Sequence, residues 1–145
     1  MARIRTVKPE YWSSEQPMNL SRDARLLFIG LWNFCDDAGI HPASYRTLKA
    51  EVFPGEDIDV APLVEEMLTQ GLLILYQVGD KAYWRVTGWH HQKIDKPTFK
   101  HPLPNGKVPR SHDDVKASFD EYSSSSRRDL TPGREGSLKE GKGNI

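Results

Sequence analysis

The chain has 145 residues, and its 20 Lys and Arg balance its 20 Asp and Glu, so its formal net charge is zero. This length predicts a single domain of ordinary size. The sequence lacks the run of about 18 apolar residues that a membrane-spanning helix needs, and its N-terminal segment lacks the apolar run of a secretory signal. Cys35 is the single cysteine, which excludes an internal disulfide framework and is typical of a cytoplasmic protein.

The first predicted helix covers residues 21–36. Ser21 is a good N-cap residue, because its side-chain oxygen can accept a hydrogen bond from a free amide of the first turn. Leu27 and Leu31 follow at the spacing of a buried helix face. Gly39 is expected to end this helix, since glycine adopts the left-handed conformation found after helices.

Two further helices are predicted before residue 72. Ser44 opens the second, and Pro54 with the glycine that follows it closes that helix. The third covers about 60–70, with Asp59 as its cap and Gly71 after its last turn.

The apolar period then changes from that of a helix to the alternation of a strand. The runs LLILYQV and KAYWRV are rich in β-forming residues and are separated by Gly79 and Asp80. A two-residue loop with glycine first predicts a β-hairpin with a type II′ turn. Alternation along the second run predicts that Trp84 lies in the core and that Tyr83 and Arg85 are exposed.

Three helices followed by a hairpin predict an α+β fold, and this element order is that of a winged helix-turn-helix. A generic small α+β domain remains an alternative. The winged-helix domain is expected to cover residues 1–109, including a basic N-terminal arm and a basic strip after the hairpin. Residues 110–145 are rich in Ser, Gly and charge, which predicts a disordered tail.

Within that tail, Val115, Phe119 and Tyr122 are spaced four and three residues apart. This spacing is compatible with a short helix that forms against a partner. Phe119 and Tyr122 are therefore candidate partner-binding residues, although chance spacing in a solvated tail is the simpler explanation of the pattern.

Four separated segments, MARIRTVKPEYW, ARLLFIGLWNFCDDAG, LKAEVFPGEDID and YWRVTGWHHQKIDKP, occur in this order within residues 1–104. Together they resemble a family of phage and prophage replication-initiation, or replisome-organiser-like, proteins related to primosome proteins. The resemblance implies an N-terminal winged helix and a role in phage DNA replication, as an origin binder or an adaptor for helicase loading in the cytoplasm of a bacterial host. It implies no catalytic residue.

Charge is sorted along the predicted domain. Residues 36–66 carry eight acids and two bases, whereas residues 81–110 carry seven bases and one acid. The third predicted helix, which in a winged helix enters the major groove, carries Glu65 and Glu66 and no base. Carboxylates are repelled by phosphates, so these two glutamates are candidates for binding a protein partner.

DNA, duplex or single-stranded, is therefore expected to be bound by basic and aromatic side chains outside the third helix. Lysines in an irregular segment are also common for solubility alone. The candidate DNA-binding residues are Arg3, Arg5, Lys8, Arg46, Lys49, Lys81, Tyr83, Arg85, Lys93, Lys96 and Lys100.

The sequence favours no enzymatic chemistry. His90 and His91 are adjacent and so project in different directions, and no partner at metal-ligand spacing accompanies them. Asp36 and Asp37 are explained better by helix termination than by a two-metal site, and no phosphate-binding glycine loop occurs. We expect no metal, cofactor or small-molecule substrate. The alternatives to a DNA-binding replication protein are an adaptor that docks a protein through its acidic face, with a helicase loader or another replication protein as partner, and a phage transcriptional regulator.

Overall fold

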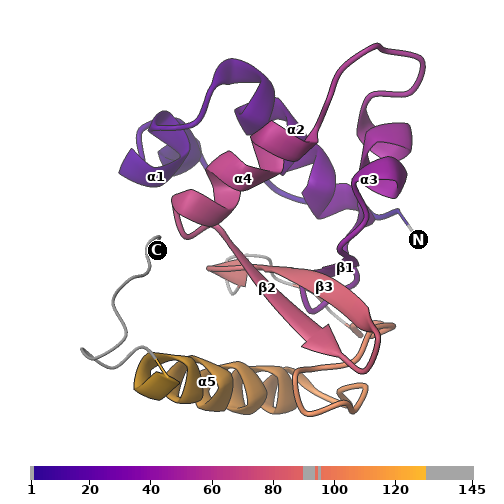
Figure 1. Cartoon of the computed structure of the whole chain (residues 1–145), viewed down its shortest axis with the longest axis vertical. Helices are drawn as coiled ribbons and strands as arrows, with labels where there is room; N and C mark the ends of the chain where they lie inside the picture. Colours follow the sequence, from indigo (N-terminus) through magenta and orange to yellow (C-terminus); the bar gives the residue numbers. More distant parts are fainter. Residues whose placement is uncertain (1, 90–93, 95, 130–145) are drawn as a thin grey trace.

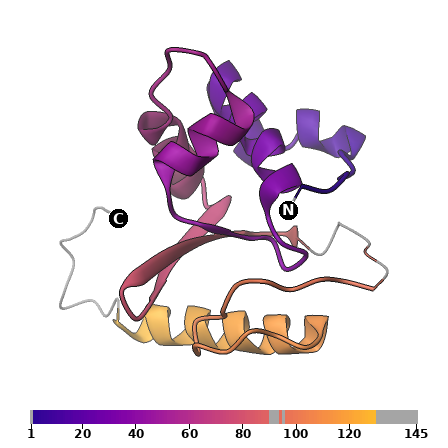
Figure 2. The same cartoon turned by 90° about the vertical axis from the view of Figure 1, so that its right-hand side faces the viewer.

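A computed structural model describes residues 2–89, 94 and 96–129, and these form a mixed α+β structure of three layers (Figure 1). Helices α1 to α4 make the first layer, a three-stranded antiparallel sheet makes the second, and helix α5 covers the other face of the sheet. Turning the molecule shows that α5 and the strip leading into it run along the sheet face opposite the other helices (Figure 2). The predicted α+β class is confirmed.

The elements of the helical layer are η1 (Pro9–Trp12), α1 (Glu15–Met18), α2 (Arg22–Phe34), α3 (Tyr45–Val52) and α4 (Ala61–Thr69). Helices α2 and α3 begin where the sequence places their caps, whereas α4 does not. The N-cap of α4 is Val60, and the predicted cap Asp59 lies one residue earlier and accepts a hydrogen bond from the Ala61 amide at 3.1 Å. The Ser21 side chain accepts a hydrogen bond from the Ala24 amide at 3.2 Å, and Ser44 accepts one from the Thr47 amide at 3.1 Å. Both side chains satisfy amides that have no partner inside the helix.

The end of α2 differs from the prediction. The helix stops at Phe34, and Cys35 is already extended. Gly39, with a φ of 79°, instead allows a close approach, since a Cβ there would lie 2.7 Å from Cδ2 of Trp89. The chain then forms the short strand β1 (Ile40–Pro42), which the sequence pattern does not predict.

The sheet contains β1, β2 (Leu73–Val78) and β3 (Lys81–Val86) in the order β1-β3-β2. In the β2–β3 hairpin Val78 pairs with Lys81, so the loop has the two predicted residues. Gly79 has a φ of 63° and Asp80 is not among the described residues with positive φ. This combination is that of the predicted type II′ turn.

The principal core lies between the helical layer and the sheet. Its members come from η1, α2, α3, α4, β2 and β3, and Trp84 is buried in it as predicted. Gly30 lets α2 approach α3, because a Cβ on this glycine would lie 2.6 Å from a methyl carbon of Val52. Close packing of this kind fixes the position of the elements that carry the candidate site.

The other face of the sheet is not exposed, which corrects two predictions. Helix α5 (His112–Asp129) lies where a disordered tail was expected, and Phe119 packs edge-to-face on Tyr76 at 5.4 Å between ring centroids. Tyr83 is consequently buried, and Arg85 is half-buried with its guanidinium over the Phe119 ring. Residues 130–145 of the predicted tail lie outside the described residues.

Among the helices that the structure describes, none combines the length and apolarity required to cross a bilayer.

Candidate nucleic-acid interface

The N-terminal arm and the strip after β3 are both attached to the turn at Asp36 and Asp37. Asp36 is buried, and its carboxylate accepts four backbone hydrogen bonds. Two come from Ala38 and Ile40, at 2.9 and 3.1 Å, and two come from Lys100 and His101, at 3.0 and 3.1 Å. Asp36 therefore orients Lys100 and His101 relative to the sheet.

Asp37 binds both the N-terminal arm and the strip after β3. Its side chain is 1% exposed and forms ion pairs with Arg3 and Arg5, and it accepts a hydrogen bond from the Thr98 amide at 2.7 Å. Burial alone would raise the pKa of Asp37. The Thr98 hydrogen bond and the positive charges of Arg5 and Arg3 outweigh burial and hold that pKa below its ordinary value.

These contacts occupy two of the three predicted basic residues of the arm. The Arg5 side chain is 3% exposed, donates to the Trp32 carbonyl at 2.9 Å and lies over the Trp89 ring. Arg3 is more exposed but is paired with Asp37. The structure gives Arg5 a role in packing, whereas Lys8 is exposed.

One groove is lined by Lys81 and by the buried Tyr83, two of the predicted DNA-binding residues. The groove, of about 370 Å³, runs between the segment that leads into α3 and the start of β3. Ser44, Lys81 and His101 line it, and we call it the β3–α3 groove. Arg46 is exposed in the first turn of α3, and Lys100 is exposed next to His101 in the chain. Lys81 thus lies in the groove, and Arg46 and Lys100 are exposed close in the chain to the groove residues Ser44 and His101.

The remaining basic candidates are placed in different ways. Lys96 is exposed and has a φ of 55°, and Lys49 is half-buried on α3. Lys93 lies outside the described residues. Tyr83 and Arg85 face α5, so the alternation argument that placed them on an exposed face was wrong, because it took no account of a helix contributed from 30 residues later.

His101 is a groove residue that sequence reasoning missed. Its backbone amide is bound by Asp36, and its ring lies 5.7 Å from the Tyr83 ring. Burial lowers the pKa of the His101 imidazole from its ordinary value, although the Asp36 charge acts in the opposite direction. A neutral imidazole offers hydrogen bonding without adding charge. No local pattern around His101 identifies it, since its position depends on the distant Asp36.

The acidic helix α4 has two different glutamates. Glu65 is exposed and carries a hydrogen bond from Tyr45; burial first, and then the charge and hydrogen bond of Glu65, raise the pKa of that tyrosine. Glu66 instead accepts hydrogen bonds from the Ser21 amide and hydroxyl, at 2.7 and 2.9 Å. Glu66 therefore holds the beginning of α2 to α4, and Glu65 is the one left exposed for a partner.

The two aromatic residues predicted to bind a partner are used within the chain. Phe119 is 4% exposed in the second core. The Tyr122 hydroxyl donates to the Leu75 carbonyl at 3.2 Å. The helical spacing of these residues was read correctly, but the surface that they cover is the sheet of their own chain.

In the part of the chain that the structure describes, no three His, Cys, Asp or Glu side chains gather in a way that could hold a metal ion. His41 is buried, and its Nε2 lies 2.7 Å from a carboxylate oxygen of Glu51. Burial raises the pKa of the Cys35 thiol well above its ordinary value, which disfavours the reactive thiolate. His90 and His91 lie outside the described residues.

Comparison with known proteins adds no relative: no protein-family model, curated protein or solved structure matches the chain.

Proposed function

We propose that the chain is a winged-helix protein that binds DNA and acts in phage or prophage DNA replication. The observation that carries the proposal is the arrangement of α2, β1, α3, α4, β2 and β3 in chain order, with β1 beside β3 in the sheet. This arrangement supports a winged helix, in which the β2–β3 hairpin is the wing.

The β3–α3 groove supports a particular mode of DNA contact. Lys81 stands at the start of β3 beside the hairpin turn and lines the groove. Arg46 and Lys100 are exposed and lie close in the chain to Ser44 and His101, which also line it. Three cations from separate elements can follow successive phosphates of a backbone. We infer that the hairpin and the beginning of α3 contact DNA, while α4 stays away from the phosphates because Glu65 would be repelled.

The role in replication is supported by the four sequence segments that resemble phage replication-initiation proteins. Under this proposal DNA binding positions the chain near an origin, where it recruits a helicase loader or another replication protein. A phage transcriptional regulator would share the fold and the DNA contacts, and would differ in the sequence that it binds.

The proposal is tested with fluorescence anisotropy of labelled duplex and single-stranded DNA, using the full chain. Lys81→Glu combined with Lys100→Glu should weaken binding at least tenfold, because two attractive phosphate contacts become repulsive. The matched control is Lys107→Glu combined with Arg110→Glu, which makes the same charge change at two exposed residues outside the groove. Equal weakening by both pairs would show that only net charge matters and would contradict the assigned groove.

The second candidate function is a protein adaptor, and the acidic surface of α4 favours it. Asp59 and Glu65 are exposed there, and α4 carries no base. Asp59→Asn with Glu65→Gln should then abolish pull-down of a helicase loader without changing DNA binding. Glu66 is excluded from this test, because its replacement would remove two hydrogen bonds to Ser21.

A further inference from the structure

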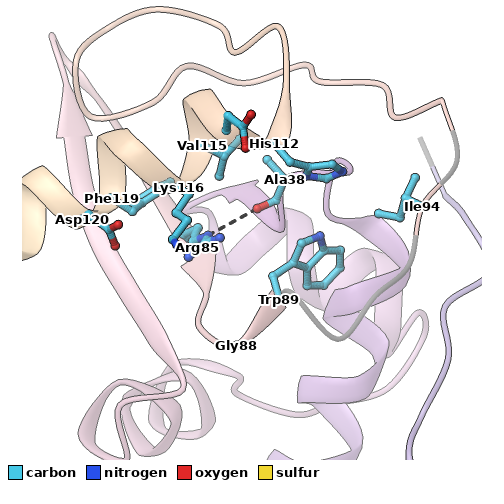
Figure 3. Close-up of a pocket in the computed structure, with 11 residues that line it drawn as sticks. Ala38, Arg85, Gly88, Trp89, Ile94, His112, Val115, Lys116, Phe119 and Asp120 are labelled. Atoms are coloured by element: carbon cyan, nitrogen blue, oxygen red, sulfur yellow. Dashed lines mark hydrogen bonds between the residues drawn. The ribbon is translucent and has the colours of Figure 1, made fainter.

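A cavity of about 760 Å³ lies between the first half of α5 and the end of β3. Figure 3 shows Arg85, Lys116 and Asp120 toward one end of this space, and Trp89 and Ile94 toward another. Cavities of several hundred Å³ that combine apolar walls with a few polar groups are the usual sites for small ligands. This cavity is separate from the β3–α3 groove, and its residues have no part in the proposed DNA contact.

Arg85 is the most unusual group in the cavity. Its Nε donates a long hydrogen bond of 3.4 Å to the Ala38 carbonyl, and its guanidinium carbon lies 4.6 Å from the centre of the Phe119 ring. Among the residues that the structure describes, its terminal nitrogens have no hydrogen bond and no carboxylate within 4.0 Å. A half-buried cation that lies over an aromatic ring, with terminal nitrogens that have no acceptor among the described residues, can take an acceptor from a ligand.

The geometry of a guanidinium limits the chemical class of the acceptor that Arg85 can bind. Its two terminal nitrogens form a planar fork that matches the two oxygens of a carboxylate or of a phosphate. Lys116, one turn before Phe119 on α5, adds a second positive charge on the same side of the cavity.

Two acidic side chains in the cavity favour one of these oxyanions over the other. Asp113 and Asp120 also line the cavity, so its two basic and two acidic side chains balance. Asp120 lies near enough to act electrostatically on Arg85, although not within ion-pair distance. A doubly charged phosphate would be repelled more strongly by these two acids than a singly charged carboxylate on the Arg85 fork.

The remaining walls select an apolar body for the ligand. Val115, Ile94 and Ala38 contribute aliphatic surface, and Trp89 contributes the edge of an indole ring whose nitrogen already donates to Asp37. Apolar surface of this kind favours burial of an aliphatic or aromatic group.

We propose that this cavity binds a small monocarboxylate with an apolar body, its carboxylate on Arg85 and Lys116 and its body against Val115, Ile94 and Trp89. The ligand is bound without chemical change. The proposal stands independently of DNA binding.

The experiment is an NMR titration of the full chain with benzoate, followed through the Trp89 indole N–H and the Arg85 Nε–H signals. Benzoate should shift both signals saturably at millimolar concentration or below. Benzamide, which has the same shape without the charge, and acetate, which lacks the apolar body, should each bind at least tenfold more weakly. Non-saturable shifts, or equal binding of benzoate and benzamide, would overturn the proposal.

Two variants test the assigned residues separately. Arg85→Met should reduce benzoate affinity at least tenfold, the loss expected for one charge-assisted hydrogen bond. Lys116→Met, at an exposed residue that does not support the core, should reduce it severalfold and decides the matter if Arg85→Met fails to fold. Lys107→Met is the matched control, because Lys107 is exposed and lies outside the cavity. Unchanged benzoate affinity in Lys116→Met would contradict the proposed site.

Discussion

Asp36 and Asp37 connect segments that are far apart in the chain. Asp36 binds four backbone amides, and Asp37 binds two arginines of the N-terminal arm and the Thr98 amide. Charge-assisted hydrogen bonds of this kind contribute about 1.5–3 kcal/mol each, and a buried group left without its partner costs a similar amount. The pair therefore fixes both the arm and the strip that carries Lys100.

The stability of this network should depend on pH in a direction set by Asp37. Its pKa is lowered in the folded chain, so its contribution is complete above the ordinary carboxyl value of 3.8 and is lost as the pH falls through the lower, folded value. Asp37→Asn should cost roughly 3 kcal/mol at pH 7, because it leaves the Arg5 charge buried without its partner. Urea unfolding between pH 7 and pH 2 measures both effects.

Asp80→Asn is the control for this prediction, since Asp80 is exposed in the hairpin turn. The control should unfold as the unmodified chain does at every pH. If Asp37→Asn lost stability with falling pH as steeply as the unmodified chain, Asp37 would not be the group responsible.

Among single residues, the sequence identified those whose role is local. The N-cap residues Ser21 and Ser44 were predicted from their own neighbours, because a cap binds an amide only three residues away. Arg5 was predicted to contact DNA, and its burial against Asp37 was not foreseen, since this partner is 32 residues distant. Spacing along the chain carries no signal for such a contact.

At the scale of elements, those determined by local sequence were predicted, and those determined by distant contacts were not. The helices that became α2, α3 and α4 and the β2–β3 hairpin follow from apolar period and turn chemistry. Strand β1 has three residues, too few for a periodic pattern. Helix α5 has a mostly polar sequence, and its narrow apolar stripe became interpretable only when the sheet face that it covers was known.

Helix α5 should therefore contribute to the stability of the fold. Phe119→Ala should lower the free energy of unfolding by roughly 3 kcal/mol, because it removes a buried ring that packs on Tyr76 and Arg85. Alanine favours helix, so the loss reports packing and not helix propensity. Urea unfolding measures the change, with Glu121→Ala at an exposed position of the same helix as control.

A change below about 0.5 kcal/mol in Phe119→Ala, equal to that of a surface substitution, would mean that α5 does not pack on the sheet in solution. Experiments on DNA binding should accordingly use the full chain. A chain ending at residue 110 would expose Tyr76 and Tyr83, which α5 covers.

At the scale of the whole molecule, zero net charge conceals an uneven distribution. Acids concentrate in residues 36–66 and bases in residues 81–110, as the sequence alone indicates. The structure refines this pattern, because it packs Arg5, Tyr83 and Arg85 against other parts of the chain. It leaves Lys81 in the β3–α3 groove, with Arg46 and Lys100 exposed close in the chain to groove residues. Folding thus reduces a broad basic region to a smaller one.

The salt dependence of duplex DNA binding tests this account most directly. Each phosphate contact releases counterions and contributes about −0.9 to the slope of log affinity against log salt, so contacts by Arg46, Lys81 and Lys100 predict a slope of about −3. Lys81→Glu with Lys100→Glu should bring that slope close to −1. Fluorescence anisotropy of the full chain across a range of salt concentrations gives both values. A slope near −3 that the double substitution reduces is the predicted result, and a slope that the substitution leaves unchanged, or the absence of binding by the folded chain, would contradict it.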